Sequence, residues 1–88
     1  MNYGLKERSV LVTGGSRGIG RATAMAYARE GARVAVTYKT QQDRAERLAS
    51  ELVTLGAAEA VAFPMDLADP ASIRTAVGNV VGRFGAVE

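Results

Sequence analysis

Glycines with a distinctive spacing follow a short apolar run near the start of the sequence. They form the pattern Gly14-x-x-x-Gly18-x-Gly20, immediately before a helical pattern. At such a junction the chain turns sharply, approaches a ligand closely and packs a helix against a strand, and a Cβ atom would obstruct each of these. Free N–H groups and the dipole at the helix start favour an anion. The turn is therefore predicted to bind a pyrophosphate. There is no Gly-Lys-Ser or Gly-Lys-Thr at the helix start, so a nucleoside-triphosphatase loop is not supported.

The residues after the next apolar run indicate which kind of dinucleotide this turn would bind. In dinucleotide-binding domains that prefer NAD, an acidic residue about 20 positions past the glycine turn binds the ribose hydroxyls. This sequence has Tyr38, Lys39 and Thr40 there instead, and Arg17 lies within the turn itself. Two cations without a carboxylate suit a 2′-phosphate, which favours NADP(H) over NAD(H). The alternative is that Lys39 and Arg17 are solvated surface charges.

The elements that must position these residues are strands and helices in alternation. Apolar, β-branched runs predict strands at Ser9 to Thr13, Arg33 to Tyr38 and Ala60 to Pro64. The connections between elements are a few residues long, which favours a parallel sheet with crossover helices. Right-handed crossovers place the first two helices on one face of the sheet and the third on the other. We therefore expect one α/β domain over residues 1–88, with residues 86–88 leading toward a further strand beside the first.

Each helix is predicted from apolar residues at helical spacing and from signals at its ends. The first begins at Gly18 and ends near Gly31, with Ile19, Ala22, Thr23 and Ala26 at helical spacing. The second opens on a capping-box-like Thr40 and Asp43 and closes at Gly56, with an apolar face of Ala45, Leu48, Ala49, Leu52 and Leu55. The third opens on the N-cap Asp69 and Pro70 and ends at Gly85, with a stripe of Ile73, Val77, Val80, Val81 and Phe84.

The segment from Thr13 to Gly20 resembles the Thr-Gly-x-x-x-Gly-x-Gly cofactor motif of the short-chain dehydrogenase/reductase family. Asp66 and Leu67, directly after the third predicted strand, are similar to the family's Asp followed by an aliphatic residue. The resemblance covers essentially the whole chain and implies a Rossmann-type sheet, the βαβαβα half of a doubly wound NAD(P)-binding domain. It also implies that the Asp66 carboxylate and the next backbone amide hold the adenine. The alternative for Asp66 is a turn former or helix cap.

Motif and charge together predict a set of cofactor-binding residues and no catalytic residue. The set is Gly14, Ser16, Arg17, Gly18, Ile19, Gly20, Tyr38, Lys39, Asp66 and Leu67. The resemblance implies that hydride transfer between nicotinamide and a carbonyl or alcohol needs a Tyr-x-x-x-Lys pair, with a serine and an asparagine. No such pair occurs, since Tyr3, Tyr27 and Tyr38 are followed four positions later by Glu7, Gly31 and Gln42.

The chain is therefore expected to be the cofactor-binding half of an NADP(H)-dependent oxidoreductase. It would be a fragment, a truncated reading frame or one piece of an interrupted protein, and a small carbonyl or alcohol substrate is expected only together with the missing half. The alternative is a non-catalytic dinucleotide-binding module or structural remnant. In either case the first strand would present an open edge, and self-association through it is expected.

Composition excludes several other classes of site. The 88 residues contain no cysteine and no histidine, which argues against disulfides, thiol nucleophiles and a structural zinc site, so no metal is expected. The net charge is +2, and the basic residues are scattered among nine acids, so nucleic-acid binding is not favoured. The apolar run after Arg8 is too short for a signal peptide or a membrane span, and a cytoplasmic location is expected.

Overall fold

A computed structural model describes residues 8–14 and 18–85 of the chain. The elements, in order, are β1 (Ser9–Val12), α1 (Gly18–Arg29), β2 (Arg33–Tyr38), α2 (Gln42–Leu55), β3 (Glu59–Pro64) and α3 (Pro70–Phe84). The strands form one parallel sheet in the order β1-β2-β3. Each strand lies within one residue of its predicted bounds, and the predicted α/β, Rossmann-type βαβαβα unit is confirmed.

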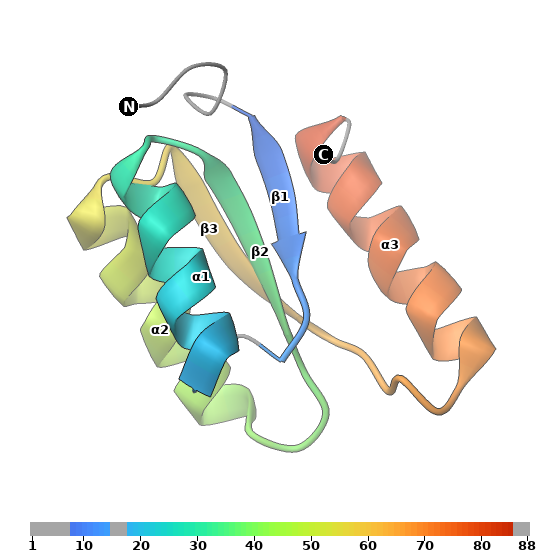
Figure 1. Cartoon of the computed structure of the whole chain (residues 1–88). Coiled ribbons are helices and arrows are strands. Elements are labelled where there is room, and N and C mark those ends of the chain that lie inside the picture. Colours follow the sequence, from blue (N-terminus) through green and yellow to red (C-terminus); the bar gives the residue numbers. More distant parts are fainter. Residues whose placement is uncertain (1–7, 15–17, 86–88) are drawn as a thin grey trace.

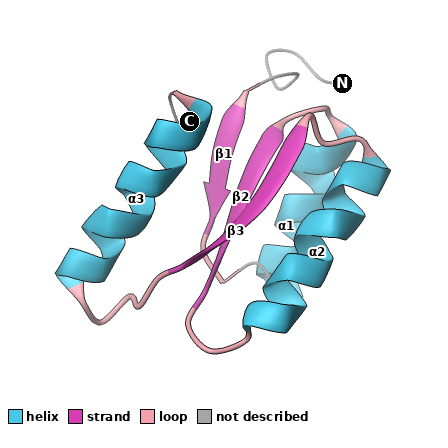
Figure 2. Cartoon of the chain, turned by 180° about the vertical axis from the view of Figure 1, so that it is seen from behind, coloured by secondary structure: helices cyan, strands magenta, loops and turns pink. Residues whose placement is uncertain are grey.

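The helices cover both faces of the sheet, as predicted (Figures 1 and 2). The helices α1 and α2 pack on one face, and α3 packs on the other. The larger part of the core lies under α1 and α2 and is built from small and branched apolar residues, among them Val34, Val36, Leu48 and Leu52. A smaller cluster of Ala35, Val80 and Phe84 lies under α3. The sheet is therefore buried more completely on the side of α1 and α2.

The predicted helix α1 is confirmed, but the residues at helical spacing in its sequence are not the ones that it buries. Ile19 is 86% exposed and Ala22 and Ala26 are also exposed, whereas Ala24 and Ala28 are fully buried against the sheet. Alanines occupy several sides of this helix, so hydrophobic spacing does not single out one face. Alanine on the buried side lets the helix backbone approach the sheet closely.

The apolar face of α2 is confirmed, but its predicted capping box is not. Ala45, Leu48, Ala49 and Leu52 are buried, and Leu55 packs against them. The helix begins at Gln42 after the N-cap residue Gln41, which makes no side-chain capping bond, so Thr40 lies one residue too early to cap it. Gly56 ends the helix with a φ of 127°, as expected of a glycine at a helix C-terminus.

The start of α3 is confirmed, and its buried stripe is narrower than predicted. The Asp69 side chain accepts a hydrogen bond from the Ala71 N–H at 3.0 Å, and Pro70 is the first helical residue. The buried residues are Ala76, Val80 and Phe84, whereas Val77 and Val81 are 39% and 40% exposed. The helix therefore contacts the sheet along a single line. Within the described residues, none of the helices combines the length and apolar character needed to cross a bilayer.

Candidate functional site

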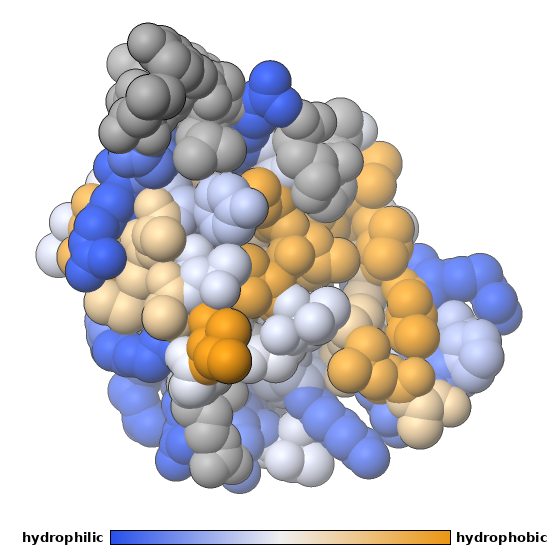
Figure 3. Space-filling model, viewed as in Figure 1, coloured by the Kyte–Doolittle hydropathy of each residue, from blue (hydrophilic) through white to orange (hydrophobic). Residues whose placement is uncertain are grey.

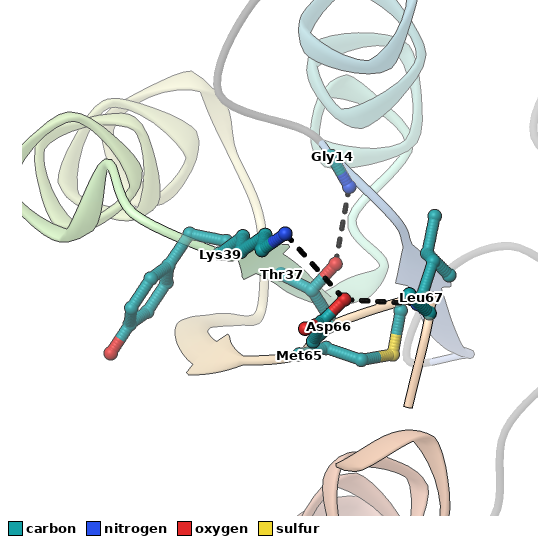
Figure 4. Close-up of a pocket in the computed structure, with 8 residues that line it drawn as sticks. Gly14, Thr37, Lys39, Met65, Asp66 and Leu67 are labelled. Atoms are coloured by element: carbon teal, nitrogen blue, oxygen red, sulfur yellow. Dashed lines mark hydrogen bonds and ion pairs between the residues drawn. The ribbon is translucent and has the colours of Figure 1, made fainter. Parts of the chain in front are cut away.

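The candidate site lies at the carboxyl edge of the sheet, where the chain leaves all three strands. After β1 it enters the glycine turn, after β2 it reaches Lys39, and after β3 it reaches Met65 and Asp66. Parallel strands bring these ends to one edge. A cavity of about 340 Å³ opens there, and Figure 4 shows it in close-up. Its lining residues are Gly14, Thr37, Tyr38, Lys39, Met65, Asp66, Leu67 and Ala68.

The glycine turn needs glycine for its backbone conformation. Gly14 and Gly18 have φ angles of 63° and 65°, in the left-handed region that residues with a Cβ rarely adopt. A Cβ built on either residue would meet no atom within 4 Å. The space beside these two glycines is therefore open, as close approach of a ligand requires. The predicted residues Ser16 and Arg17 lie outside the described residues.

Thr37, a residue that the sequence prediction missed, joins the turn to β2. Its side-chain oxygen accepts a hydrogen bond from the Gly14 N–H at 3.1 Å, and the residue is only 2% exposed. A hydroxyl in an otherwise apolar strand was the signal that could have indicated this position. The sequence alone gave no way to tell which loop that hydroxyl faces.

Hydrogen bonds fix the loop after β3 in one conformation. The Met65 N–H donates to the Tyr38 carbonyl at 2.7 Å, which extends the β2–β3 pairing by one residue. The Asp66 N–H donates to the Ser72 hydroxyl of α3 at 2.8 Å. In turn, the Asp66 carboxylate accepts from the Ala68 N–H at 2.9 Å. Asp66 therefore does form a turn, as its alternative interpretation required, and it also lines the cavity.

Two charged groups face each other at the cavity. The Lys39 Nζ lies 3.9 Å from the Asp66 Oδ1, and their side chains are 68% and 38% exposed. An ion pair this exposed contributes at most about 1 kcal/mol, so the lysine is held only weakly. Among the described lining residues, these are the two that carry a charge. The cation at the end of β2 is therefore available to an anionic ligand.

The structure brings part of the predicted set together. Gly14, Tyr38, Lys39, Asp66 and Leu67 all line the cavity. The predicted residues of the first turn of α1 do not line it; they are Gly18, Ile19 and Gly20. The lining residues missed from the sequence are Thr37, Met65 and Ala68. In residues 8–14 and 18–85, no group of acidic side chains is arranged to hold a metal ion.

These features define the class of the fold. A parallel sheet with alternating helices, a glycine turn after its first strand and a cavity outside the carboxyl ends of the strands is the Rossmann-type arrangement. In such sheets, ligands bind in the crevice at that edge.

The particular family follows from comparison with known proteins. Residues 8–88 match the model of the family described as short chain dehydrogenase, and the chain belongs to this family. The resemblance drawn from the glycine motif and from Asp66 and Leu67 is thereby confirmed at the level of the family.

Relatives of known sequence are much longer than this chain. The uncharacterized oxidoreductase YghA of Escherichia coli is 39% identical over 84 residues, which are 96% of this chain and 29% of that protein. The 3-oxoacyl-(acyl-carrier-protein) reductase FabG of Staphylococcus epidermidis is 40% identical over 81 residues, which are 92% of this chain and 33% of that protein. The chain thus spans about a third of the length of these relatives.

Solved structures that resemble this chain are likewise about three times its length. One is a short chain dehydrogenase from Burkholderia cenocepacia, solved in complex with NADP, which is 43% identical in sequence and superposes with a TM-score of 0.89. The match covers 96% of this chain and 34% of the Burkholderia chain. A dehydrogenase/reductase from Sinorhizobium meliloti is 40% identical with a TM-score of 0.89, over 94% of this chain and 32% of its own.

Proposed function

We propose that this chain binds the adenosine and pyrophosphate end of a nicotinamide dinucleotide, and that it prefers NADP(H) to NAD(H). The observation that carries the proposal is the position of Lys39. Its ammonium group lies at the cavity directly after β2, where the sequence offers no carboxylate to receive ribose hydroxyls. The similar dehydrogenase from Burkholderia cenocepacia was solved in complex with NADP, which supports NADP(H) as a ligand.

The residues present fit such a ligand. The cavity of about 340 Å³ falls within the usual range for small-molecule sites, and apolar side chains of Met65, Leu67 and Ala68 offer a surface for a flat ring. The glycine turn would receive the pyrophosphate, Lys39 the 2′-phosphate, and Asp66 with the following amide the adenine. The proposed binding set is Gly14, Ser16, Arg17, Gly18, Ile19, Gly20, Tyr38, Lys39, Asp66 and Leu67.

The activity that this binding would serve is oxidation or reduction. A bound nicotinamide dinucleotide supplies or accepts a hydride, and the residues of this chain would bind and orient its adenosine end. We propose a carbonyl or alcohol substrate, and we assign the handling of that substrate to the part of the relatives that this chain does not span. Residues 1–88 would then form the N-terminal cofactor-binding part of such an oxidoreductase.

A charge-removing substitution tests the proposed preference. Lys39→Gln keeps a polar side chain and removes the cation, so affinity for NADP⁺ should fall by about 10- to 150-fold, the effect of one lost charge-assisted contact. Affinity for NAD⁺ should change little, because that ligand has no 2′-phosphate. Titration calorimetry with both cofactors measures the two dissociation constants.

The matched control is Arg29→Gln, which removes an exposed cation at the end of α1, on the far side of the molecule from the glycine turn. It should leave both dissociation constants unchanged. Equal affinity of the unchanged chain for NADP⁺ and NAD⁺, or equal losses in both variants, would contradict the preference. Failure to bind either cofactor would contradict dinucleotide binding itself.

A further inference from the structure

A buried hydroxyl near the end of β2 stands out because an aliphatic side chain would suit the same place. Thr37 follows Val34, Ala35 and Val36 in the strand and is 2% exposed. Valine has nearly the same shape and suits a buried strand at least as well. Burying a hydroxyl is unfavourable unless it forms a hydrogen bond. What threonine adds at this position is therefore the bond that its oxygen makes.

That bond reaches a part of the site that the sheet does not hold. Main-chain pairing between β1 and β2 ends at Val12 and Val36. Gly14 lies two residues further on, and its N–H donates to the Thr37 oxygen at 3.1 Å, as Figure 4 shows. Among the described residues, Thr37 is the acceptor for the Gly14 N–H. The side chain of Thr37 thus extends the connection between the strands into the glycine turn.

The opposite side of the cavity is fixed without Thr37. Pairing of β2 with β3 continues to Tyr38 and Pro64, and the Met65 N–H donates to the Tyr38 carbonyl. The Asp66 N–H is bonded to Ser72 of α3. The Lys39–Asp66 side of the cavity is therefore held by main chain and by α3. Within residues 8–14 and 18–85, the recorded side-chain link from the glycine turn to β2 is the bond between the Gly14 N–H and Thr37.

We propose that Thr37 is a positioning residue of the candidate site. By holding the Gly14 N–H it sets the distance between the glycine turn and the Lys39–Asp66 side, and a ligand that spans both sides depends on that distance. A ligand that touches the Lys39–Asp66 side alone does not depend on it. This inference rests on the proposed dinucleotide binding, and it assigns Thr37 no contact with the ligand.

Binding of two different ligands distinguishes a positioning role of Thr37 from a general effect on the stability of the fold. NADP⁺ carries a pyrophosphate and would span the cavity, whereas adenosine 2′-monophosphate lacks one and would reach only the Lys39–Asp66 side. Thr37→Val should weaken NADP⁺ binding about tenfold, the effect of losing one hydrogen bond of ordinary strength, and should change adenosine 2′-monophosphate binding by less than about twofold. Thr37→Ser keeps the hydroxyl and should restore NADP⁺ binding. Nuclear magnetic resonance titration of the 9.2 kDa chain measures both affinities.

The matched control is Thr75→Val, the same change at an exposed position of α3. It should leave both affinities unchanged. The positioning role alone would be overturned if Thr37→Val lowered the affinity for both ligands equally. It would also be overturned if Thr37→Ser bound NADP⁺ as weakly as Thr37→Val. Absence of NADP⁺ binding by the unchanged chain would overturn the proposed function and this inference with it.

A second measurement does not depend on the fold of any variant. In the unchanged, ligand-free chain, the Gly14 amide should exchange with solvent more slowly than the amide of Lys39, whose N–H has no hydrogen-bond partner in the part of the chain that the structure describes. Hydrogen exchange followed by nuclear magnetic resonance resolves both amides. Exchange of Gly14 as fast as that of Lys39 would show that Thr37 does not hold the turn.

Discussion

At the scale of single residues, Asp66 shows how one side chain serves both the fold and the candidate site. Its Oδ1 receives the Ala68 N–H and faces the Lys39 ammonium, so the carboxylate stabilises the turn after β3 without any ligand. Both interpretations of Asp66 drawn from the sequence are compatible with this geometry. A carboxylate has two oxygens and several acceptor positions, and turn formation uses only some of them. The remaining positions are available for an amino group of a ligand.

A substitution at Gly14 tests the glycine turn. Gly14→Val places a branched side chain at a φ of 63°, which costs about 1–2 kcal/mol of stability, and it fills open space at the cavity. We therefore expect a lower melting temperature and loss of NADP⁺ binding. Thermal unfolding and calorimetric titration measure the two effects.

The control for this experiment is Gly78→Ala in the middle of α3. There the backbone is helical and an added Cβ meets nothing within 4 Å, so stability should rise by about 0.5–1 kcal/mol and binding should not change. Wild-type affinity and melting temperature in Gly14→Val would show that the turn does not approach a ligand.

Residues of the candidate site could be predicted only where the residue type and its place after a strand indicate a role. Gly14, Lys39 and Asp66 stand within two residues of a strand end and have a chemistry that suggests a role, and the structure places all three at the cavity. Thr37 was missed because its role depends on which loop lies beside it. That neighbour is fixed by the pairing of β1 with β2, a contact between residues far apart in the chain.

At the scale of elements, strand positions were more predictable than helix faces. A short run of branched residues that ends at a glycine or at polar residues leaves little freedom in where β1 or β2 can lie. In α1, by contrast, alanines on several sides make the faces nearly equal in hydrophobicity. Packing against the sheet then selects Ala24 and Ala28, a choice that local sequence does not contain. In α3 the missed residue, Ala76, is likewise small.

The two predicted helix caps offer a direct test at this scale. Asp69→Ala removes the acceptor of the Ala71 N–H and should lower the free energy of unfolding by about 1 kcal/mol, the usual value of an N-cap side chain. Thr40→Ala is the matched control, because no side chain caps α2 and Thr40 lies outside that helix. It should change stability by less than about 0.5 kcal/mol.

Urea unfolding of both variants measures the difference in stability. If Thr40→Ala were as destabilising as Asp69→Ala, the start of α2 would have to be revised toward the capping box. Asp69→Asn, which keeps an acceptor oxygen, should retain most of the stability.

At the scale of the whole molecule, apolar surface is distributed unevenly. Figure 3 shows hydrophobic residues gathered over β1 and along α3. Among the described residues the strand β1 pairs only with β2, and no strand in this part of the chain lies along its other edge. The exposed valines of α3, Val77 and Val81, add to this surface. An open strand edge beside apolar surface favours association between chains.

We therefore predict that the 88-residue chain self-associates. Size-exclusion chromatography with light scattering over a range of concentrations should show dimers or larger species. Val77→Lys combined with Val81→Lys should weaken association, because the added charges oppose burial of α3 against a second chain. Thr75→Lys combined with Asn79→Lys adds the same charge at exposed positions of α3 away from those valines and should have a smaller effect. A monomer at every concentration would contradict the prediction.

The end of β2 has a consequence for how this protein could diverge. The last paired residue of the strand is Tyr38, opposite Pro64, and Lys39 stands one position beyond it with a mostly exposed side chain. The sheet is held by main-chain bonds and buried apolar groups that position 39 does not share. Under the proposed function, exchange of that one residue would therefore change cofactor preference while leaving the sheet intact. Under the proposed function, selection would be free to alter the ligand at position 39 with little effect on folding, because this residue lies beyond the paired strand and outside the buried core.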